Sequence, residues 1–336
     1  MRFLLDDEQR AFARSLDALL TAADTPSVVR SWGAGDHTPG RALWARLADA
    51  GVFALAVPEA YGGVGPLPVE LAVAFVELGR HAVPGPLAET VAVAALLTEP
   101  GPAKRFLPGL AAGELIATLA PRGSYALDAD AAGLLLTVGD GELRLAEGHG
   151  AVRASPDPAR RFGLPAADGE LLASGVDLAP AVGTARLATA AQALGVGLAL
   201  LDTTVAYVGR RSQFGVPVGS FQAVKHRLAD VRIALEFARP LVFGAALTMA
   251  PADVAAAKVA AGEAAYLAAR TALQSHGAIG YTAEYDLSLW LARARALRTA
   301  WGTPAECRAL VLGEERALVH AEERAAGPHT GVTRPP

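Results

Sequence analysis

The sequence predicts a mainly α-helical protein in which a small β segment separates two helical parts. Apolar residues recur at helical spacing before about residue 112 and again after Pro180, which indicates amphipathic helices. Between residues 113 and 177, short apolar runs alternate with glycine and aspartate, a pattern typical of small strands joined by turns. A chain of 336 residues with 52% apolar content can bury a sizeable core.

The N-terminal part, residues 1–112, is expected to consist of helices separated by short Gly and Pro breaks. Its apolar residues recur three and four positions apart, so each helix presents one face to a shared core. The stripe of the first helix comprises Phe12, Leu16, Leu19 and Leu20, and that of a later helix comprises Leu71, Ala74, Phe75 and Leu78.

The middle part, residues 113–177, is expected to form a reduced β domain. Residues 133–138 and 142–145 are short apolar runs that end at Gly and Asp. Such runs are typical of small antiparallel strands.

The C-terminal part, residues 178–325, is expected to form a four-helix bundle. Two long apolar stripes lie within residues 187–208 and 221–238, and two further helices are expected near residues 252–276 and 284–324. The tail, residues 326–336, is expected to be frayed.

Composition excludes several classes of protein. The formal net charge of −4 is spread along the chain, so no basic patch for nucleic acid is visible. The lone Cys307 cannot form an internal disulfide or a cysteine-built metal site. Charged residues interrupt the apolar runs before about 18 apolar positions accumulate, so no membrane span is expected. The N-terminus lacks the pattern of a signal peptide, and a cytoplasmic location is the default expectation.

The most informative segment begins at Arg211 and continues through Phe214 and Gly215 to Phe221 and Gln222. Arg211 offers a planar fork of donors that suits a phosphate, and the Gln222 amide can pair with the edge of a ring or a ribose. The alternative is that Arg211 is a surface arginine at a helix C-terminus, where a cation is favoured in any case.

A second segment, from Gln274 through Gly277 to Gly280, offers another amide and flexible backbone that a ligand can approach closely. Both segments lie on or beside expected helices that could fold back on each other. Together they favour a site for a long anionic cofactor. The alternative for the second segment is an ordinary helix C-terminus ended by glycine.

These two segments resemble the C-terminal flavin-binding part of the acyl-CoA dehydrogenase family, which reads R-x-x-F-G, then Q, then Q-x-x-G-G-x-G-[FY]-[ST]. The N-terminal part matches the same family in order: Trp44 to Gly51, Val57 to Gly65, and Glu77 to Arg80. The resemblance covers nearly the whole chain. It implies the acyl-CoA dehydrogenase fold and FAD as the cofactor, contacted by Arg211, Phe214, Gln222, Gln274, Gly277, Gly280, Gly302 and Thr303.

The family abstracts the α-proton of an acyl thioester with a glutamate. The resemblance places its commonest position at Trp301, directly before Gly302 and Thr303, and an alternative position at Ala185. Neither an indole nor a methyl group can take a proton from carbon, so both positions lack a base.

Two other residues near these positions have open roles. Glu306 is a weak candidate for a relocated base, with a solvent-facing role in the first turn of a helix as the alternative. Arg186 follows the alternative base position, and the family orients it toward the active site. Without a carboxylate neighbour, Arg186 could hold substrate or merely cover a helix surface.

The β segment also departs from the family pattern. The motif T-E-P-x-x-G-S-D has its nearest match in Thr118 to Ser124, which lacks the glutamate and the final aspartate, and no tryptophan lies between Trp44 and Trp290. The resemblance therefore implies that the contacts to the flavin ring are reduced while those to its nucleotide half are kept.

We expect the chain to take part in FAD-dependent α,β-desaturation of an acyl-CoA thioester, in fatty acid or steroid side-chain breakdown. It would act as the base-lacking subunit that completes the FAD site of a longer relative in a heterotetramer, with electron-transfer flavoprotein as the acceptor by analogy. One alternative is a self-sufficient homo-oligomeric dehydrogenase with a relocated base, and another is a structural or regulatory relative that binds no flavin. No metal, nucleic acid or membrane is expected to bind.

Overall fold

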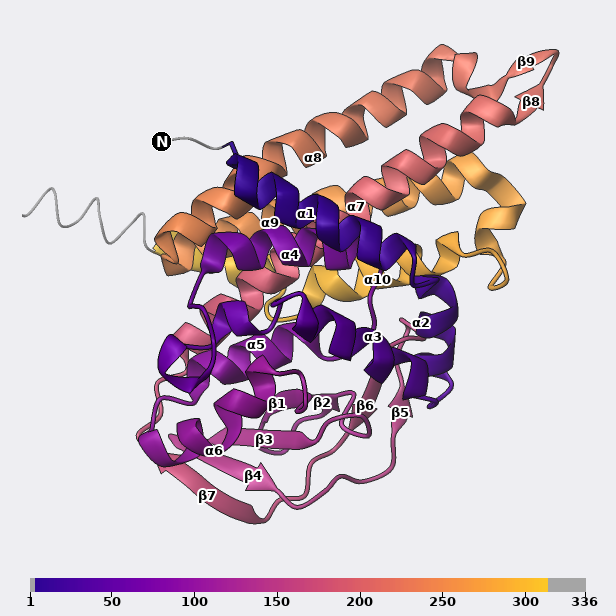
Figure 1. Ribbon diagram of the computed structural model, residues 1–336. Coiled ribbons are helices and arrows are strands. Elements are labelled where there is room, and N and C mark those ends of the chain that lie inside the picture. Colours follow the sequence, from indigo (N-terminus) through magenta and orange to yellow (C-terminus); the bar gives the residue numbers. More distant parts are fainter. Residues whose placement is uncertain (1–3, 314–336) are drawn as a thin grey trace, which may run out of the picture.

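A computed structural model describes residues 4–313 of the chain. The elements form three tiers, with the long C-terminal helices on one side, the N-terminal helices in the middle and the strands on the opposite side (Figure 1). This arrangement confirms the predicted fold class, mainly α with a small β region and a C-terminal bundle.

The N-terminal tier is helical throughout. Its first helix begins with a capping box, in which Asp6 accepts a hydrogen bond from the backbone of Gln9 and the Gln9 side chain accepts one from the backbone of Asp6. The elements are α1 (Asp7–Thr21), α2 (Thr25–Gly33), α3 (Thr38–Asp49), η1 (Ala54–Ala56), η2 (Glu59–Tyr61), α4 (Pro68–Arg80), α5 (Leu87–Leu96) and α6 (Pro100–Ala111).

The β tier contains two small sheets. The first has the order β1-β3-β4-β7 and the second has the order β2-β6-β5. The strands are β1 (Ala117–Pro121), β2 (Ala126–Leu127), β3 (Leu134–Gly139), β4 (Glu142–Ala146), β5 (Arg153–Ala154), β6 (Arg161–Gly163) and β7 (Gly169–Ser174).

The expectation of antiparallel strands holds for β3 and β4, which form a hairpin through Asp140 and Gly141, both at positive φ. It fails for β1, which pairs with β3 in parallel. The start of β1 also has a tertiary contact: the Thr90 hydroxyl on α5 donates to the Ala117 carbonyl and accepts from the Ala117 amide. This contact holds the start of β1 against a helix, and local pattern could not reveal it.

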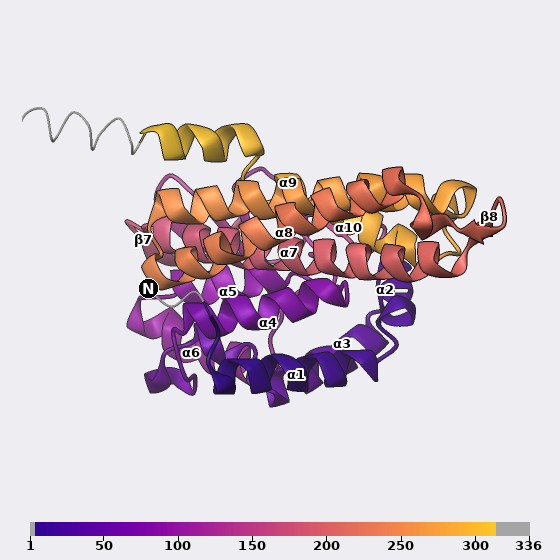
Figure 2. The same ribbon diagram turned by 90° about the horizontal axis from the view of Figure 1, so that it is seen from above.

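The C-terminal tier is a bundle of long helices with a hairpin at one end (Figure 2). The long helices run alongside one another. The helix α7 lies between the other helices of this tier and the helices α4 and α5 of the N-terminal tier. The elements are α7 (Ala179–Arg210), β8 (Ser212–Gln213), β9 (Val216–Pro217), η3 (Val218–Ser220), α8 (Gln222–Thr248), α9 (Pro251–His276), η4 (Gly277–Tyr281) and α10 (Leu287–Thr299).

The prediction of one helix over residues 284–324 was wrong. The helix α10 ends at Thr299, and a helix resumes at residues 304–313. Between them Trp301 has φ 57° and Gly302 has φ 137°, values that no right-handed helix contains. The carbonyls of this break accept hydrogen bonds from other helices, so tertiary contacts compensate for the lost helical bonds. Residues 314–324 and the tail expected to be frayed lie outside the described residues.

The helix α7 packs against both α4 and α9, and glycines permit the crossing with α4. A Cβ on Gly195 would lie 1.9 Å from the Val76 carbonyl oxygen, and a Cβ on Gly79 would lie 2.1 Å from the Gln192 carbonyl oxygen. No side chain fits at such distances, so the two backbones touch. Although α7 is long and apolar enough to span a membrane, most of it is buried inside the bundle, as in the core helix of a globular fold.

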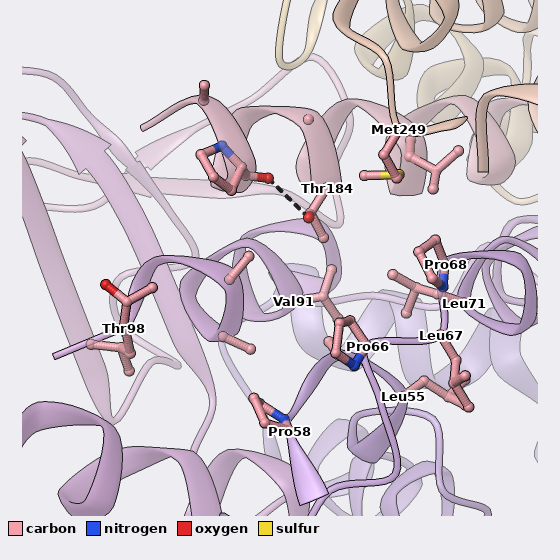
Figure 3. Close-up of a pocket in the computed structure, with 18 of the residues that line it drawn as sticks. Leu55, Pro58, Pro66, Leu67, Pro68, Leu71, Val91, Thr98, Thr184 and Met249 are labelled. Atoms are coloured by element: carbon pink, nitrogen blue, oxygen red, sulfur yellow. Dashed lines mark hydrogen bonds between the residues drawn. The ribbon is translucent and has the colours of Figure 1, made fainter. Parts of the chain in front are cut away.

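A cavity of about 720 Å³ lies where the N-terminal tier meets the start of α7. Its walls come from the loop around Pro58 to Pro68, from α5 and from the turn between α8 and α9 (Figure 3).

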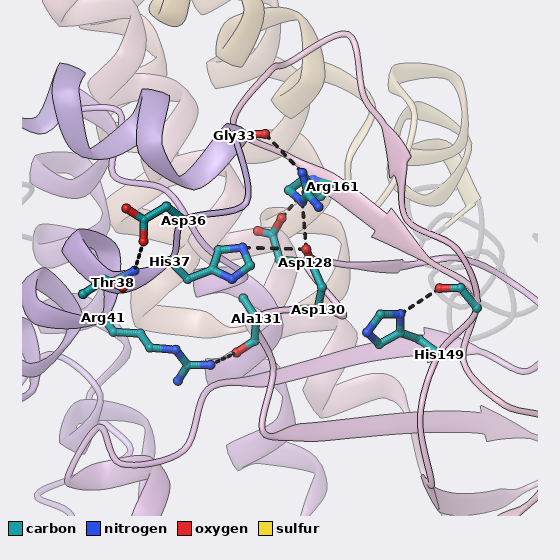
Figure 4. Close-up of polar contacts among 11 residues, drawn as sticks. Gly33, Asp36, His37, Thr38, Arg41, Asp128, Asp130, Ala131, His149 and Arg161 are labelled. Atoms are coloured by element: carbon teal, nitrogen blue, oxygen red, sulfur yellow. Dashed lines mark hydrogen bonds and ion pairs between the residues drawn. The ribbon is translucent and has the colours of Figure 1, made fainter.

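A polar cluster ties the N-terminal tier to the strands (Figure 4). The Arg161 guanidinium donates to Asp130 at 2.8 Å and to the Gly33 carbonyl at 3.2 Å, and the Arg161 amide donates to Asp128 at 2.9 Å. Asp128 is fully buried, and burial raises its pKa to about 7, partly offset by the hydrogen bond from the Arg161 amide.

This raised pKa makes stability depend on pH. Because folded Asp128 keeps a proton that the unfolded chain releases above about pH 4, the free energy of unfolding should fall as pH rises from about 4 to 7. Asp128→Asn removes the ionisation and tolerates the φ of 49° at this position. As pH rises through that window, we expect the free energy of unfolding of the variant to increase relative to that of the parent by up to about 1.4 kcal/mol per pH unit.

Urea unfolding of both proteins at pH 5, 6 and 7 measures this difference. The pKa of Glu77 is also raised to about 7 by burial, but Glu77 is present in both proteins and cancels in the comparison. Equal pH slopes for the two proteins would show that Asp128 titrates normally.

Candidate functional site

The loop after α10 is held in place by two basic side chains from other helices. Arg186 on α7 donates from Nε to the Trp301 carbonyl at 2.9 Å. Lys258 on α9 donates from Nζ to the carbonyls of Arg298 at 3.1 Å and Gly302 at 3.3 Å. The loop that the sequence singled out at residues 298–303 is therefore anchored between two core helices.

Lys258 is 2% exposed, and desolvation lowers its pKa to about 8. At neutral pH the ammonium group still carries its charge, so it can donate to both carbonyls. The positive charge strengthens these hydrogen bonds, because charge-assisted hydrogen bonds are stronger than neutral ones.

The Trp301 side chain points into the protein and forms a hydrogen bond there. Its Nε1 donates to Oε1 of Glu89 on α5 at 2.9 Å, and Glu89 is 5% exposed. The space between α5, α7 and α10 around this pair, also lined by Thr189 and Gln192, retains only about 10 Å³. The indole therefore fills the chamber directly behind the loop.

On the outer side of Trp301 an open cleft of about 650 Å³ lies between the strands and α10. Its walls combine aromatic rings with guanidinium groups, a lining that suits a flat anionic molecule. The aromatic and basic lining residues are Tyr125, Phe162, Tyr266, Arg160, Arg295, Arg298 and Trp301.

Glu306, the candidate for a relocated base, is engaged in a helix cap. Its Oε2 accepts from the Thr303 amide at 2.8 Å and from the Thr303 hydroxyl at 2.9 Å. These hydrogen bonds lower the pKa of Glu306, which weakens it as a base. Ala185, the alternative base position, is fully buried and offers only a methyl group.

The other group of expected site residues lies at the far end of α7. The hairpin β8–β9 projects there beyond the ends of α7 and α8 (Figures 1 and 2). Phe214 occupies the turn of this hairpin with φ 53° and is 92% exposed. Its ring and that of Phe221 meet in an edge-on arrangement, with 6.3 Å between the ring centroids. A bulky aromatic residue at positive φ is strained, and an exposed one is costly in water, so this tip is suited to contact another molecule.

The structure brings the two halves of the motif together at this end. Arg211 donates from Nη1 to the Tyr207 hydroxyl at 3.0 Å, and that hydroxyl donates to the His276 carbonyl at 3.4 Å. The rings of Tyr207 and His276 stack with their centroids 4.1 Å apart. His276 is followed by Gly277, the C-cap of α9, which has φ 65°. Gln222 and Gln274 are both exposed.

His276 contributes an unusual feature to this surface. Its Nδ1 pairs with the Ala272 carbonyl at 2.8 Å, while its buried Nε2 has no hydrogen-bond partner among the residues that the structure describes. Burial also lowers the pKa of His276, which favours the neutral ring. A neutral ring that donates through Nδ1 leaves Nε2 as an unused acceptor.

The two groups of residues lie far apart within one chain. Arg186 and Arg211 are 25 residues apart on α7, and at a rise of about 1.5 Å per residue this separation is about 37 Å. The structure thus joins Arg211, Phe214, Gln222, Gln274, Gly277 and Gly280 at one end, and Arg186, Trp301, Gly302, Thr303 and Glu306 near the other.

Sequence reasoning missed Glu89, Lys258 and Tyr207. Glu89 could have been noticed as a lone charge within the apolar run Leu87–Leu96, and Tyr207 as the residue one helical turn before Arg211. No local signal marks Lys258, because its role depends on carbonyls 40 and 44 positions away.

Comparison with known proteins identifies similar chains. Residues 6–114 match the model of the acyl-CoA dehydrogenase N-terminal domain, and residues 178–313 match that of the C-terminal domain. A Mycobacterium tuberculosis protein named acyl-CoA dehydrogenase IpdE2 is 35% identical over 304 residues, which covers 89% of this chain and 95% of that protein.

Solved structures share the fold. The ChsE4-ChsE5 complex from Mycobacterium tuberculosis superposes with a TM-score of 0.80 and 25% identity, covering 94% of this chain and 99% of that one. A glutaryl-CoA dehydrogenase from Mycobacterium smegmatis in complex with FADH2 has a TM-score of 0.76 and 19% identity, covering 94% and 95%. The expectation of FAD as the cofactor of such proteins is confirmed.

The hydrogen bond between Trp301 and Glu89 can be tested by stability. Trp301→Phe keeps an aromatic ring but leaves a buried carboxylate oxygen without its donor, and we expect a loss of roughly 1–3 kcal/mol in the free energy of unfolding. Combining it with Glu89→Leu removes both polar groups and should restore part of that loss. Urea unfolding of the four proteins measures the coupling, and strictly additive effects would show that the pair does not interact.

Proposed function

The chain belongs to the acyl-CoA dehydrogenase family of flavin-dependent oxidoreductases, and we propose that it serves as a base-lacking subunit. In this role it takes part in α,β-desaturation of an acyl-CoA thioester by completing the FAD site of a longer relative. The bound flavin would supply the hydride acceptor. This chain's residues would hold the nucleotide half of that flavin and orient it.

The filled chamber behind the loop supports this proposal. A proton acceptor must come within hydrogen-bond reach of the carbon acid that it deprotonates. Here Trp301 occupies the family position of that acceptor, and its indole leaves about 10 Å³ of space beside Glu89. An acyl chain does not fit into that volume, so this chain's own chamber cannot accept substrate.

The separation along α7 carries the proposal furthest. About 37 Å lies between Arg186, beside the Trp301 loop, and Arg211. The two groups lie toward opposite ends of α7, and we propose that they serve different molecules of cofactor. The group around Arg211 is therefore free to serve a flavin whose ring lies in another subunit.

The group around Arg211 suits the nucleotide half of FAD. Arg211 is exposed and spends one donor on Tyr207, and the exposed amides of Gln222 and Gln274 can pair with adenine or ribose. Phe214, 92% exposed at the hairpin tip, supplies an apolar surface for contact with another subunit.

The relatives agree with a heteromeric assembly. The similar ChsE4-ChsE5 structure is a complex of two different chains. By the same analogy we place this chain in a heterotetramer with a longer acyl-CoA dehydrogenase subunit, in the cytoplasm, with electron-transfer flavoprotein as the electron acceptor.

The main rival is a self-sufficient dehydrogenase with a relocated base. Glu306 is a weaker candidate than the sequence indicated, because its carboxylate caps Thr303. Glu89 is the stronger candidate, because it lines both the filled chamber and the open cleft. A relative that binds no flavin is the second rival.

Production of the chain alone and together with the longer relative encoded nearest to it separates these functions. We expect the visible absorbance of bound flavin only when both chains are present. Addition of acyl-CoA should then bleach this absorbance. Turnover by the chain alone would overturn the proposal, and its loss in Glu89→Gln or Glu306→Gln would then identify the base. A complex without flavin would support the flavin-free rival.

Replacement of Arg211 tests the nucleotide contact directly. Arg211→Ala should weaken retention of FAD in the complex by about 1.5–3 kcal/mol, or roughly 10- to 100-fold in dissociation constant, because a charge-assisted hydrogen bond is lost. The matched control is Arg210→Ala, which removes a neighbouring exposed arginine whose hydrogen bond, within residues 4–313, goes to the Ala206 carbonyl of its own helix. Equal FAD retention in both variants would remove Arg211 from the site.

A further inference from the structure

The apolar cavity beside α5 is separate from the site described above. Its lining shares no residue with the filled chamber or the open cleft among the described parts of the chain. On α7 it is lined by Gly183, Thr184 and Leu187, whereas the filled chamber is lined by Thr189 and Gln192 on another side of the helix. The cavity is therefore a separate feature of the fold.

The volume and walls suit a small molecule. About 720 Å³ lies within the range of pockets that enclose drug-sized ligands. Leu71, Val91 and Leu187 are buried and form part of the apolar lining. The lining also includes five prolines, whose fixed φ stiffens the wall and whose nitrogens offer no donor. These are Pro58, Pro66, Pro68, Pro180 and Pro251. Figure 3 labels the first three.

The polar groups of the lining disfavour an anion. Asp177 is the one charged residue that lines the cavity within the described chain, and its carboxylate also accepts from the Ala179 amide. The Thr184 hydroxyl donates to the Pro180 carbonyl and so is already paired (Figure 3). The other hydroxyl-bearing residues of this described lining, Tyr61 and Thr98, are neutral. With no lysine or arginine there, the one charge that a carboxylate or a phosphate would meet is negative.

One side of the cavity is adjustable. Met249, which ends α8 at φ 49°, reaches over Gly183, and a Cβ built on Gly183 would have Met249 Cε at 3.9 Å as its nearest neighbour. A thioether side chain adapts to ligands of different shape. A larger side chain at residue 183 would enter the cavity without striking backbone.

We propose that this cavity is a binding site for an uncharged apolar small molecule, such as a long-chain alcohol, distinct from the site for a CoA thioester. Apolar burial would supply the affinity, and Asp177 would exclude carboxylates of the same chain length. The site lies in this chain alone, so it does not depend on the proposed partner.

Titration of the purified full chain with the neutral dye Nile red, followed by displacement with 1-decanol or decanoate at pH 8, tests the proposal. We expect 1-decanol to displace the dye at concentrations at least about tenfold lower than decanoate, since only the headgroup charge differs. Asp177→Asn should reduce the ratio between the decanoate and 1-decanol concentrations that displace the dye.

Filling the cavity supplies the second arm of the test. Gly183→Leu should weaken dye binding at least about tenfold, whereas Gly209→Leu, on the same helix with open space around its Cβ, should leave it unchanged. Circular dichroism checks that both variants fold. If Gly183→Leu does not fold, Ala95→Leu on α5 fills the same cavity instead. Equal displacement by alcohol and carboxylate, or unchanged dye binding in the filled variants, would overturn the proposal.

Discussion

The close crossing of α7 with α4 is the constraint on which the rest of the structure depends. Because Gly79 and Gly195 each face a carbonyl of the opposite helix, the two backbones meet without intervening side chains. This contact places α7 in the centre of the molecule, where α5, α8, α9 and α10 also pack against it. Both groups of candidate functional residues are positioned by this one helix, Arg186 toward one end and Arg211 at the other.

Packing around α7 also gives the two groups of candidate residues different environments. The loop at Trp301 is fixed in position, since Arg186 and Lys258 both donate hydrogen bonds to its carbonyls. Its side chain nevertheless closes the chamber and engages Glu89 in a buried hydrogen bond. At the far end, the exposed arginine and amides remain open to another molecule. The proposed division of labour between two subunits follows from these opposite states of burial.

Much of the fold was predictable because apolar periodicity records which face of a helix is buried. The stripe from Leu187 to Val208 correctly indicated a long core helix, and the glycine at residue 277 correctly marked the end of α9. The break at residues 300–303 was not predictable in this way. Gly302 and Pro304 disfavour a continuous helix there, but the left-handed backbone at Trp301 is maintained by contacts with α7 and α9.

By itself, the sequence determined the helical tiers, the family and the residue types at the two vacant base positions, because these depend on local pattern and motif. Only the tertiary structure decided that Glu89 meets Trp301 and that β1 runs parallel to β3. Each of these outcomes depends on which distant groups become neighbours. That choice is made by the packing of the helices around α7, and local spacing along the chain does not encode it.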